Sequence, residues 1–469
     1  MPALKSQTRI FIALAALIAL IPLFYTEEDW RGKRDWENCK REIEAKGETM
    51  DWDKLIPPRV PEEKNFFAAP KMQEWFVRSS SWPQPTNELT GLSTNDLTVT
   101  IITNKTDALN YLSWSDQFTP DFNLIRDALK RPYARIDGDY SDVLEIPFPN
   151  FVSTRAVAQV LAQRAKCHLI LNEPQKALDE LTFLHDLRLL FEGAPTHQPV
   201  EIVTAMIDEA VAQLYAKSVS EGLQSHIWKK QQLAILQKQL NERNVFGFIA
   251  ESFREKPARS NRFFEQLEHG NKIDRAHSKK IFGIPISWMR HPTSPYALLF
   301  NAYPRGWILQ NYVVEIEAEQ KIIDAMDNTN MIVSVDKIDR EQGNIEAIAR
   351  SRSPFALLSG ISIPNYSKAL QSAAYIQNYI NETEIACALE RYKLANGDYP
   401  KTLDALVPQF MDKVPHDIIG GQPLKYRRTD DGKFLLYSVG WNETDDGGLD
   451  LQHGNGSINY TNGDWVWKN

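Results

Sequence analysis

The sequence predicts a mainly α-helical protein that begins with a single membrane-spanning helix and ends with a small α+β module. Three observations support this fold class: an uncharged apolar run at residues 10–25, apolar residues at helical spacing from 153 to about 243, and two strand-like segments that flank Asp430-Asp431-Gly432. Apolar residues at i, i+3, i+4 and i+7 indicate amphipathic helices, and an Asp-Gly turn between apolar segments indicates a hairpin. We therefore expect the middle of the chain to be a helical bundle or a short α-solenoid.

Composition narrows the classes of protein to which the chain can belong. Its 469 residues leave room for roughly three domains, and 43% hydrophobic residues can fill a sizeable core. The net charge of −8 is spread along the chain without clustered Lys and Arg, so we expect no nucleic-acid partner. The three cysteines, Cys39, Cys167 and Cys387, are too few and too scattered for a disulfide framework.

The N-terminus carries a signal for membrane insertion. Residues 10–25, IFIALAALIALIPLFY, hold no charge and follow Lys5 and Arg9, as in the n-region of a secretory signal. As a helix this run is roughly 24 Å long against a hydrocarbon core of about 30 Å, and Tyr25 and Trp30 can anchor its far end at the interface. We expect an uncleaved signal anchor, with a short tail inside and the bulk of the chain exported. A cleaved signal peptide and a core helix are the alternatives.

Residues 1–29 are thus the tail and anchor, and residues 30–150 form the next segment. Residues 30–50 interleave acidic and basic side chains at helical spacing, which predicts a solvated helix that leaves the membrane. Residues 51–95 are rich in Pro and Ser, which favours loop and extended chain. One or two short helices are expected within 104–130.

Residues 151–360 are predicted to be a helical-hairpin domain. Pro174 lies at the first position of one helix, where its missing N–H is not needed. Residues 272–304 are expected to be a long loop. The expected hairpins are 153–171 with 174–191 and 199–223 with 226–243, followed by helices at 245–270 and about 305–330.

Residues 361–469 are predicted to be the α+β module, a long helix packed on a small antiparallel sheet. The helix spans 365–397 and ends at Gly397, and Thr402 is the expected N-cap of a short helix after it. The expected strands are PLKYRRT (423–429), KFLLYSVG (433–440) and DWVWK (464–468).

The same module carries short motifs in a fixed order. A Tyr-x-x-x-Asn-Gly-x-Tyr-Pro stretch ends the helix, a Gly-x-Pro-x-x-Tyr segment follows, and a Tyr-Ser-x-Gly segment opens an acidic loop. The residues are Tyr392, Asn396, Gly397, Tyr399, Pro400, Gly421, Pro423, Tyr426, Tyr437, Ser438 and Gly440. Over about 85 residues this run resembles the globular domain of the major type II secretion pseudopilin. The resemblance implies an α+β domain whose acidic loop binds calcium.

The N-terminal side is similar to another group of proteins and also departs from the pseudopilins. Residues 31–58 resemble the juxtamembrane stretch of membrane-anchored bacterial envelope proteins that end in this module. That similarity implies the bacterial inner membrane, with the bulk of the chain on the periplasmic side. A pseudopilin has a processed leader, a Glu in its hydrophobic helix and an uninterrupted helix into the globular domain, whereas here the apolar run has no acidic residue and about 340 residues follow it. We interpret the module as a domain used on another architecture.

The acidic loop has two interpretations. Asn442, Asp445, Asp446 and Asp450 can supply oxygen ligands to calcium, and Gly447 and Gly448 allow the backbone to curl around an ion. Asn, Asp and Gly between two strands are also ordinary turn residues that need no ion.

We find no pattern typical of catalysis. The His residues form no metal-binding spacing, and nucleophile-elbow, Walker and Rossmann patterns do not occur. We interpret His168 and His185 as helix-face residues instead of ligands. The tryptophans Trp114, Trp228, Trp288 and Trp307 are interpreted as core residues. The carboxylates Asp208, Glu209, Glu315, Glu317 and Glu319 are interpreted as solvated helix faces.

These observations favour a non-enzyme. The main hypothesis is a membrane-anchored bacterial envelope protein that binds a protein or envelope partner through its helical hairpins, or acts as a scaffold. One alternative is an accessory component of a type II secretion or pilus-like machine. A second alternative is an envelope hydrolase with an irregular site in residues 245–330.

Overall fold

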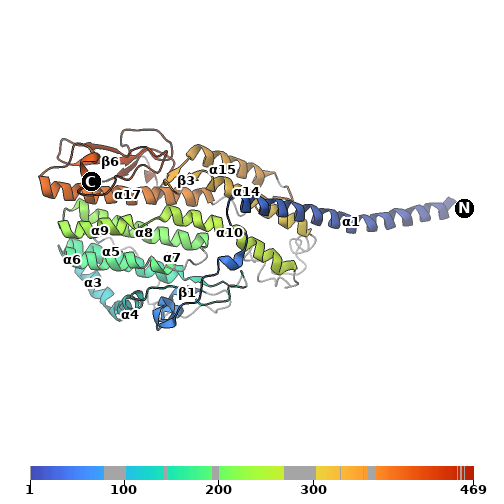
Figure 1. The fold of residues 1–469 in the computed structure, drawn as a ribbon, viewed down its shortest axis with the longest axis horizontal. Coiled ribbons are helices and arrows are strands. Elements are labelled where there is room, and N and C mark those ends of the chain that lie inside the picture. The colour runs from blue at the N-terminus through green and yellow to red at the C-terminus, as the bar shows by residue number, and fades with distance from the viewer. Residues whose placement is uncertain are drawn as a thin grey trace. The chain divides into compact units, whose positions relative to one another are not determined.

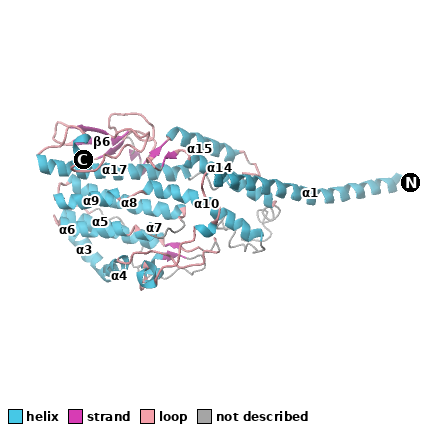
Figure 2. Ribbon diagram, viewed as in Figure 1, coloured by secondary structure: helices cyan, strands magenta, loops and turns pink. Residues whose placement is uncertain are grey.

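A computed structural model shows a mainly helical protein with small antiparallel sheets, which confirms the mainly α class (Figure 1, Figure 2). The structure describes only the backbone at residues 2–18, 264, 267, 268, 349, 366, 453, 454, 457 and 458. The described residues are 2–78, 102–141, 143, 146–192, 200–268, 303–327, 329–351, 353–356, 359, 366–450, 453–454, 457–458 and 460–468.

The chain folds into two units, each built from three separate segments. The first unit comprises Met1–Trp52, Lys256–Ile322 and Lys337–Ser367. The second comprises Asp53–Glu255, Ile323–Asp336 and Lys368–Asn469. The domains expected from the sequence are single consecutive ranges, whereas each unit combines three separate segments. The expected domain boundaries stay predictions.

In the first unit, two helices run side by side in the same direction. They are α1, Pro2–Ala45, and α14, Arg305–Ile323. The side chain of Asp29 accepts from the backbone N–H of Gly306 at 2.8 Å, and farther along Lys46 donates to Gln320 at 3.4 Å. This unit also holds most of α15, Val335–Arg350, and the second half of α10, Val245–Glu268.

Two glycines let α1 and α14 approach until their backbones touch. A Cβ placed on Gly32 would lie 2.2 Å from the carbonyl oxygen of Gly306, and one on Gly306 would lie 1.8 Å from the carbonyl oxygen of Glu28. Both separations are far below a normal van der Waals contact. Glycine is therefore required at this crossing because no other residue fits between the helices.

The predicted anchor, residues 10–25, lies within α1, which is a single helix of 44 residues. The helix predicted at 30–50 is confirmed as the second part of α1, and Gly47 follows it with φ 86°. Within the part of the chain that the structure describes, no helix is long and apolar enough to cross a membrane. Most of the anchor's side chains, up to residue 18, lie outside the described ones.

The second unit is built from successive layers of helices, and Figure 1 shows them one above another. A first layer holds α3 and α4, a second holds α5 and α6, and a third holds α8 and α9. The long helix α17 covers the third layer, where Asn241 donates to Glu384 at 3.2 Å. The bounds are α3 Lys105–Ser115, α4 Thr119–Leu129, α5 Phe151–Ile170, α6 Pro174–Asp186, α7 Leu189–Glu192, α8 Ile202–Gln224, α9 Lys230–Asn241 and α17 Tyr366–Asn396.

The two predicted hairpins are confirmed, and the sequence explains their ends. Pro174 is the first residue of α6, as expected, and Asn172 in the turn before it takes φ 60°. Asn150 caps α5 by accepting from the N–H of Val152 at 3.2 Å. Cys167 in α5 and Cys387 in α17 are buried free thiols.

The C-terminal module consists of α17 and a three-stranded antiparallel sheet in the order β5-β6-β9. Leu436 in the central strand pairs with Tyr426 on one side and Trp467 on the other. Thr402 precedes a short 3-10 helix, Leu403–Leu406, but its side chain makes no cap hydrogen bond. The strands are β5 Lys425–Arg428, β6 Phe434–Ser438 and β9 Trp465–Trp467, with the small pair β7 His453–Gly454 and β8 Ser457–Ile458.

Several elements were not predicted. Helix α15 was not predicted, and neither was the hairpin of β3, Met326–Asp327, and β4, Ile332–Val333. The predicted loop 272–304 lies outside the described residues except for its last two.

Between α1 and α3 the described chain holds short elements. They are the 3-10 turns Trp52–Lys54, Glu62–Lys64 and Phe66–Ala68, the helix α2 Met72–Phe76 and the strand β1 Val77–Arg78, which pairs with β2 Phe148–Pro149.

Candidate binding pocket in the helical hairpins

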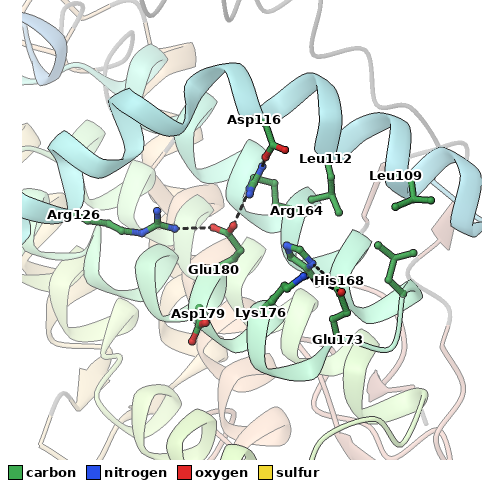
Figure 3. A pocket seen from close by; sticks show the side chains of 11 residues that line it. Leu109, Leu112, Asp116, Arg126, Arg164, His168, Glu173, Lys176, Asp179 and Glu180 are labelled. Atoms are coloured by element: carbon green, nitrogen blue, oxygen red, sulfur yellow. Dashed lines mark hydrogen bonds and ion pairs between the residues drawn. The ribbon is translucent and has the colours of Figure 1, made fainter.

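An open pocket lies in the second unit, where the first two helical layers meet (Figure 3). Its volume is about 650 Å³. One part of its wall is apolar and the rest is charged. The lining residues are Leu109, Leu112, Asp116, Arg126, Arg164, His168, Leu171, Glu173, Lys176, Asp179 and Glu180.

One side of the pocket is formed by the turn between α5 and α6. His168 lies in the last turn of α5 and Glu173 immediately precedes α6, so the turn places the two side chains together. The Nδ1 atom of His168 lies 2.8 Å from Oε2 of Glu173, and Nζ of Lys176 lies 2.9 Å from Oε1 of the same carboxylate. The hydrogen bonds from Lys176 and His168 lower the pKa of Glu173, so this carboxylate is ionised at neutral pH.

The ionised carboxylate fixes the orientation of the imidazole. Glu173 can only accept a hydrogen bond, so Nδ1 of His168 carries the hydrogen. In the neutral ring, Nε2 is then an acceptor. Figure 3 shows the ring among the lining side chains, with this second nitrogen directed away from Glu173.

The opposite side of the pocket is held by a buried carboxylate between two arginines. Glu180 accepts from Nε of Arg164 at 2.8 Å and from Nη2 of Arg126 at 3.1 Å. Arg164 also donates to Asp116 at 3.0 Å and to the hydroxyl of Ser115 at 2.7 Å. These bonds connect α3, α4, α5 and α6 at one point, so they fix the shape of this wall.

The pocket wall combines paired charged groups with an apolar surface. The described lining residues include no hydroxyl or thiol side chain, and most of the charged groups already pair with one another. Leu109, Leu112 and Leu171 add an apolar surface beside these pairs. Such a wall can contact a ligand that carries both apolar and polar groups.

The acidic loop lies elsewhere in the second unit, after β6. Asn442 donates to Oδ2 of Asp446 at 3.0 Å, so two of the four predicted ligands are brought together. Asp445 accepts from the hydroxyl of Tyr437 at 2.9 Å and pairs with Lys425 at 3.2 Å. The fourth predicted ligand, Asp450, pairs with Nζ of Lys468 at 2.8 Å.

A carboxylate that was not selected from the sequence organises this loop. Asp464 is fully buried and accepts from the backbone N–H groups of Asp446, at 3.2 Å, and Gly448, at 2.6 Å. The described residues contain no group of three or more His, Cys, Asp or Glu side chains arranged for a metal ion. Calcium binding at the loop stays a prediction.

The interpretation of the helix carboxylates as solvated faces is wrong for four of them. Asp208 and Glu209 are buried because they lie on the sides of α8 that face its neighbours, whereas the exposed face of α8 carries Val203 and Met206. Asp208 pairs with buried Arg243 at 2.6 Å. In the first unit, Glu315 and Glu319 are buried against Lys256, whereas Glu317 is exposed as expected.

The histidine and tryptophan interpretations have mixed outcomes. His168 and His185 lie on helices as expected, and Nε2 of buried His185 lies 3.2 Å from the carbonyl oxygen of Gln239. The core position of Trp228 is confirmed. Trp114 and Trp307 are only partly buried, and Trp288 lies outside the described residues.

The comparisons with known proteins do not identify a relative. No family model, curated protein or solved structure matches the chain. The site is therefore interpreted from its own geometry.

Proposed function

We propose that this chain is a membrane-anchored envelope protein of bacteria that binds a partner protein without catalysis and acts as a scaffold. The observation that carries the proposal is the pocket between the helical hairpins. Its wall is rigid because buried Glu180 joins Arg126 and Arg164, and its charges are largely neutralised by each other. A rigid, half-apolar wall of this kind can bind a ligand without contributing a group that reacts with it.

A segment of a protein is the ligand class that fits best. A volume of about 650 Å³ accommodates a few residues of peptide, and the opening lets the chain continue on both sides. Apolar side chains of the segment contact Leu109, Leu112 and Leu171. Its backbone N–H groups donate to Nε2 of His168 and to the exposed carboxylate of Asp179.

The exposed apolar residues in the middle of α1 support the membrane part of the proposal. Leu20 and Leu23 are 57% and 63% exposed, and Ile21 and Phe24 are also exposed. These four positions point to different sides of the helix, and each side chain keeps about half or more of its surface exposed. An apolar medium around the helix would remove this surface from water.

Site-specific photo-crosslinking in bacterial cells tests the partner-binding function. A photoreactive amino acid replaces Leu109 in the pocket, and in the control it replaces Leu394, which is equally exposed on α17 away from the pocket. We expect a defined protein adduct from position 109 and none from position 394. The adduct should weaken when exposed Lys176→Glu changes the charge of the pocket. No adduct at 109, or the same adduct from both positions, would contradict the proposal.

A role as an accessory component of a secretion or pilus-like machine is the second candidate. It is supported by the way the pseudopilin-like motif residues pack in the C-terminal module. The ring of Tyr399 meets Phe434 edge-on with centroids 4.9 Å apart, and the Tyr426 hydroxyl donates to the carbonyl oxygen of Pro400 at 2.8 Å. This candidate predicts that the full chain co-purifies with pseudopilins from envelope extracts. Their absence from the purified complex would remove it.

A further inference from the structure

Aromatic rings gather in the first unit at the point where the exposed apolar part of α1 ends. Phe24 meets Trp307 edge-on with ring centroids 5.8 Å apart. Trp307 also contacts Tyr303 at 5.2 Å and Phe355 at 5.5 Å. The cluster joins α1 to the first residues of α14. Trp307 is fixed there because its Nε1 donates to Glu28 at 2.9 Å.

Arginines and a further tryptophan extend this cluster along α1. Trp30 is 59% exposed, and the guanidinium of Arg34 lies over its ring at 5.6 Å. Arg31 lies over the ring of Phe355 at 5.8 Å. Arg305, the first residue of α14, is exposed. Aromatic rings beside arginines are typical of the polar interface of a bilayer, where rings contact acyl chains and guanidinium groups reach lipid phosphates.

The carboxylates near the cluster differ in how strongly they would repel an anionic membrane surface. Glu28 is buried and pairs with Arg31 at 3.0 Å, so its negative charge is not exposed at the surface. Asp29 is engaged by the N–H of Gly306 at the start of α14. Glu27 is exposed and faces the same region as the arginines. The exposed charge near the cluster is therefore mainly positive.

We propose that these residues form an interfacial collar that rests on the bilayer surface. The collar consists of Phe24, Trp30 and Arg34 on α1, Tyr303, Arg305 and Trp307 at the start of α14, and Phe355. Its occupant is the lipid headgroup layer, because the collar is continuous with the exposed apolar residues Leu20 to Phe24. This inference rests on the proposed membrane anchor and adds that α14 also contacts the membrane.

Spin labels on the full chain in lipid nanodiscs test the collar. The nanodiscs contain phosphatidylcholine with phosphatidylglycerol, and each variant carries one new cysteine: Leu20→Cys in the anchor, Arg305→Cys in the collar, or Glu44→Cys on an exposed face near the end of α1. The native cysteines, Cys39, Cys167 and Cys387, are buried and stay unlabelled under native conditions. Relative accessibility to oxygen and to a water-soluble nickel complex reports the depth of each label.

We expect the label at position 20 in the hydrocarbon core, the label at 305 at headgroup depth, and the label at 44 in water. If 305 is as accessible to nickel as 44 while 20 is in the core, the collar is overturned and the anchor stands. If 20 is also in water, the anchor fails and the collar fails with it. A second comparison uses nanodiscs of phosphatidylcholine alone, where the label at 305 should become more accessible to nickel because the anionic headgroups that attract the arginines are gone.

Discussion

Gly32 on α1 and Gly306 on α14 meet backbone to backbone, and this contact fixes how the two helices pack in the first unit. The N–H of Gly306 donates to Asp29, and the indole of Trp307 donates to Glu28. Two carboxylates of α1 therefore face the N-terminus of α14, where unpaired N–H groups and the helix dipole favour negative charge. Close approach and capping act together at the same point.

Replacing one of these glycines should destabilise the first unit. Gly306→Ala places a methyl group against the Glu28 carbonyl, so the helices must separate, at a cost of roughly 1–3 kcal/mol or more. The matched control is Gly343→Ala on α15, where an added Cβ meets nothing within 4 Å. The control should gain roughly 0.5–1 kcal/mol because Ala favours helix over Gly. Chemical denaturation measures both variants; equal effects would contradict the close packing.

The two arginines that bind Glu180 should contribute unequally to stability. The side chain of Arg164 is 12% exposed and that of Arg126 is 37% exposed, so water can replace Arg126 more easily. We expect Arg164→Met to cost about 3–5 kcal/mol, as when one partner of a buried pair is removed. Arg126→Met should cost about 1 kcal/mol or less. Urea denaturation compares them, and a larger loss for Arg126→Met would disprove the assignment.

Glu209 should make the protein less stable as the pH rises toward neutrality. Burial raises the pKa of this carboxyl from 4.5 to about 7. The folded state then holds the proton more tightly than the unfolded state, so the stabilisation is complete below about pH 4.5 and is lost as the pH rises through 7. Glu209→Gln should remove this trend and be more stable than the natural chain at pH 8, by at most about 3 kcal/mol.

The difference between the unfolding free energies of the two chains, measured from pH 4.5 to 8, isolates this effect. The comparison is needed because buried His185 acts in the opposite direction: burial lowers its pKa to about 3. Asp404→Asn, at an exposed carboxyl in the same unit, is the control for the loss of one carboxylate. A flat difference for Glu209→Gln would show that Glu209 is not protonated in the folded state.

Calcium should compete with two lysines at the acidic loop. Lys425 and Lys468 pair with Asp445 and Asp450, so an ion that binds these carboxylates must displace both side chains. We expect Lys425→Gln with Lys468→Gln to strengthen calcium binding. Calcium in excess over chelator should then raise the thermal midpoint of the double variant more than that of the natural chain. If neither midpoint moves, the loop is a turn held by Asp464.

The sequence predicted the helical hairpins and the C-terminal sheet because their signals are local. Apolar residues at helical spacing mark α5, α6, α8 and α9, and the turn at Asp430-Asp431-Gly432 joins β5 to β6 with Gly432 at φ 77°. The helix α15 was missed because it is polar and contains Gly343. Its buried apolar residues Val335, Ile338 and Ile345 do lie at helical spacing, but they are few and separated by a long polar stretch.

The pocket could not be predicted because its parts are distant in the sequence. Asp116 and Glu180 come together only through Arg164, in three different elements. The pair of His168 and Glu173 could have been predicted more easily. The two residues are only five positions apart, on either side of the short turn between two predicted helices. The burial of Glu209 depends on α17, more than a hundred residues later in the chain.

The continuity of α1 has a mechanical consequence. One helix of 44 residues is roughly 66 Å long and includes both the predicted membrane segment and the part that contacts α14. A change in tilt at one end is transmitted to the other end as the motion of a lever. Its weak point is Pro22, which cannot donate the backbone hydrogen bond of its turn. In the proposed membrane-anchored state, a change in bilayer thickness would thus bend the helix at Pro22 before it disturbed the contact between Gly32 and Gly306.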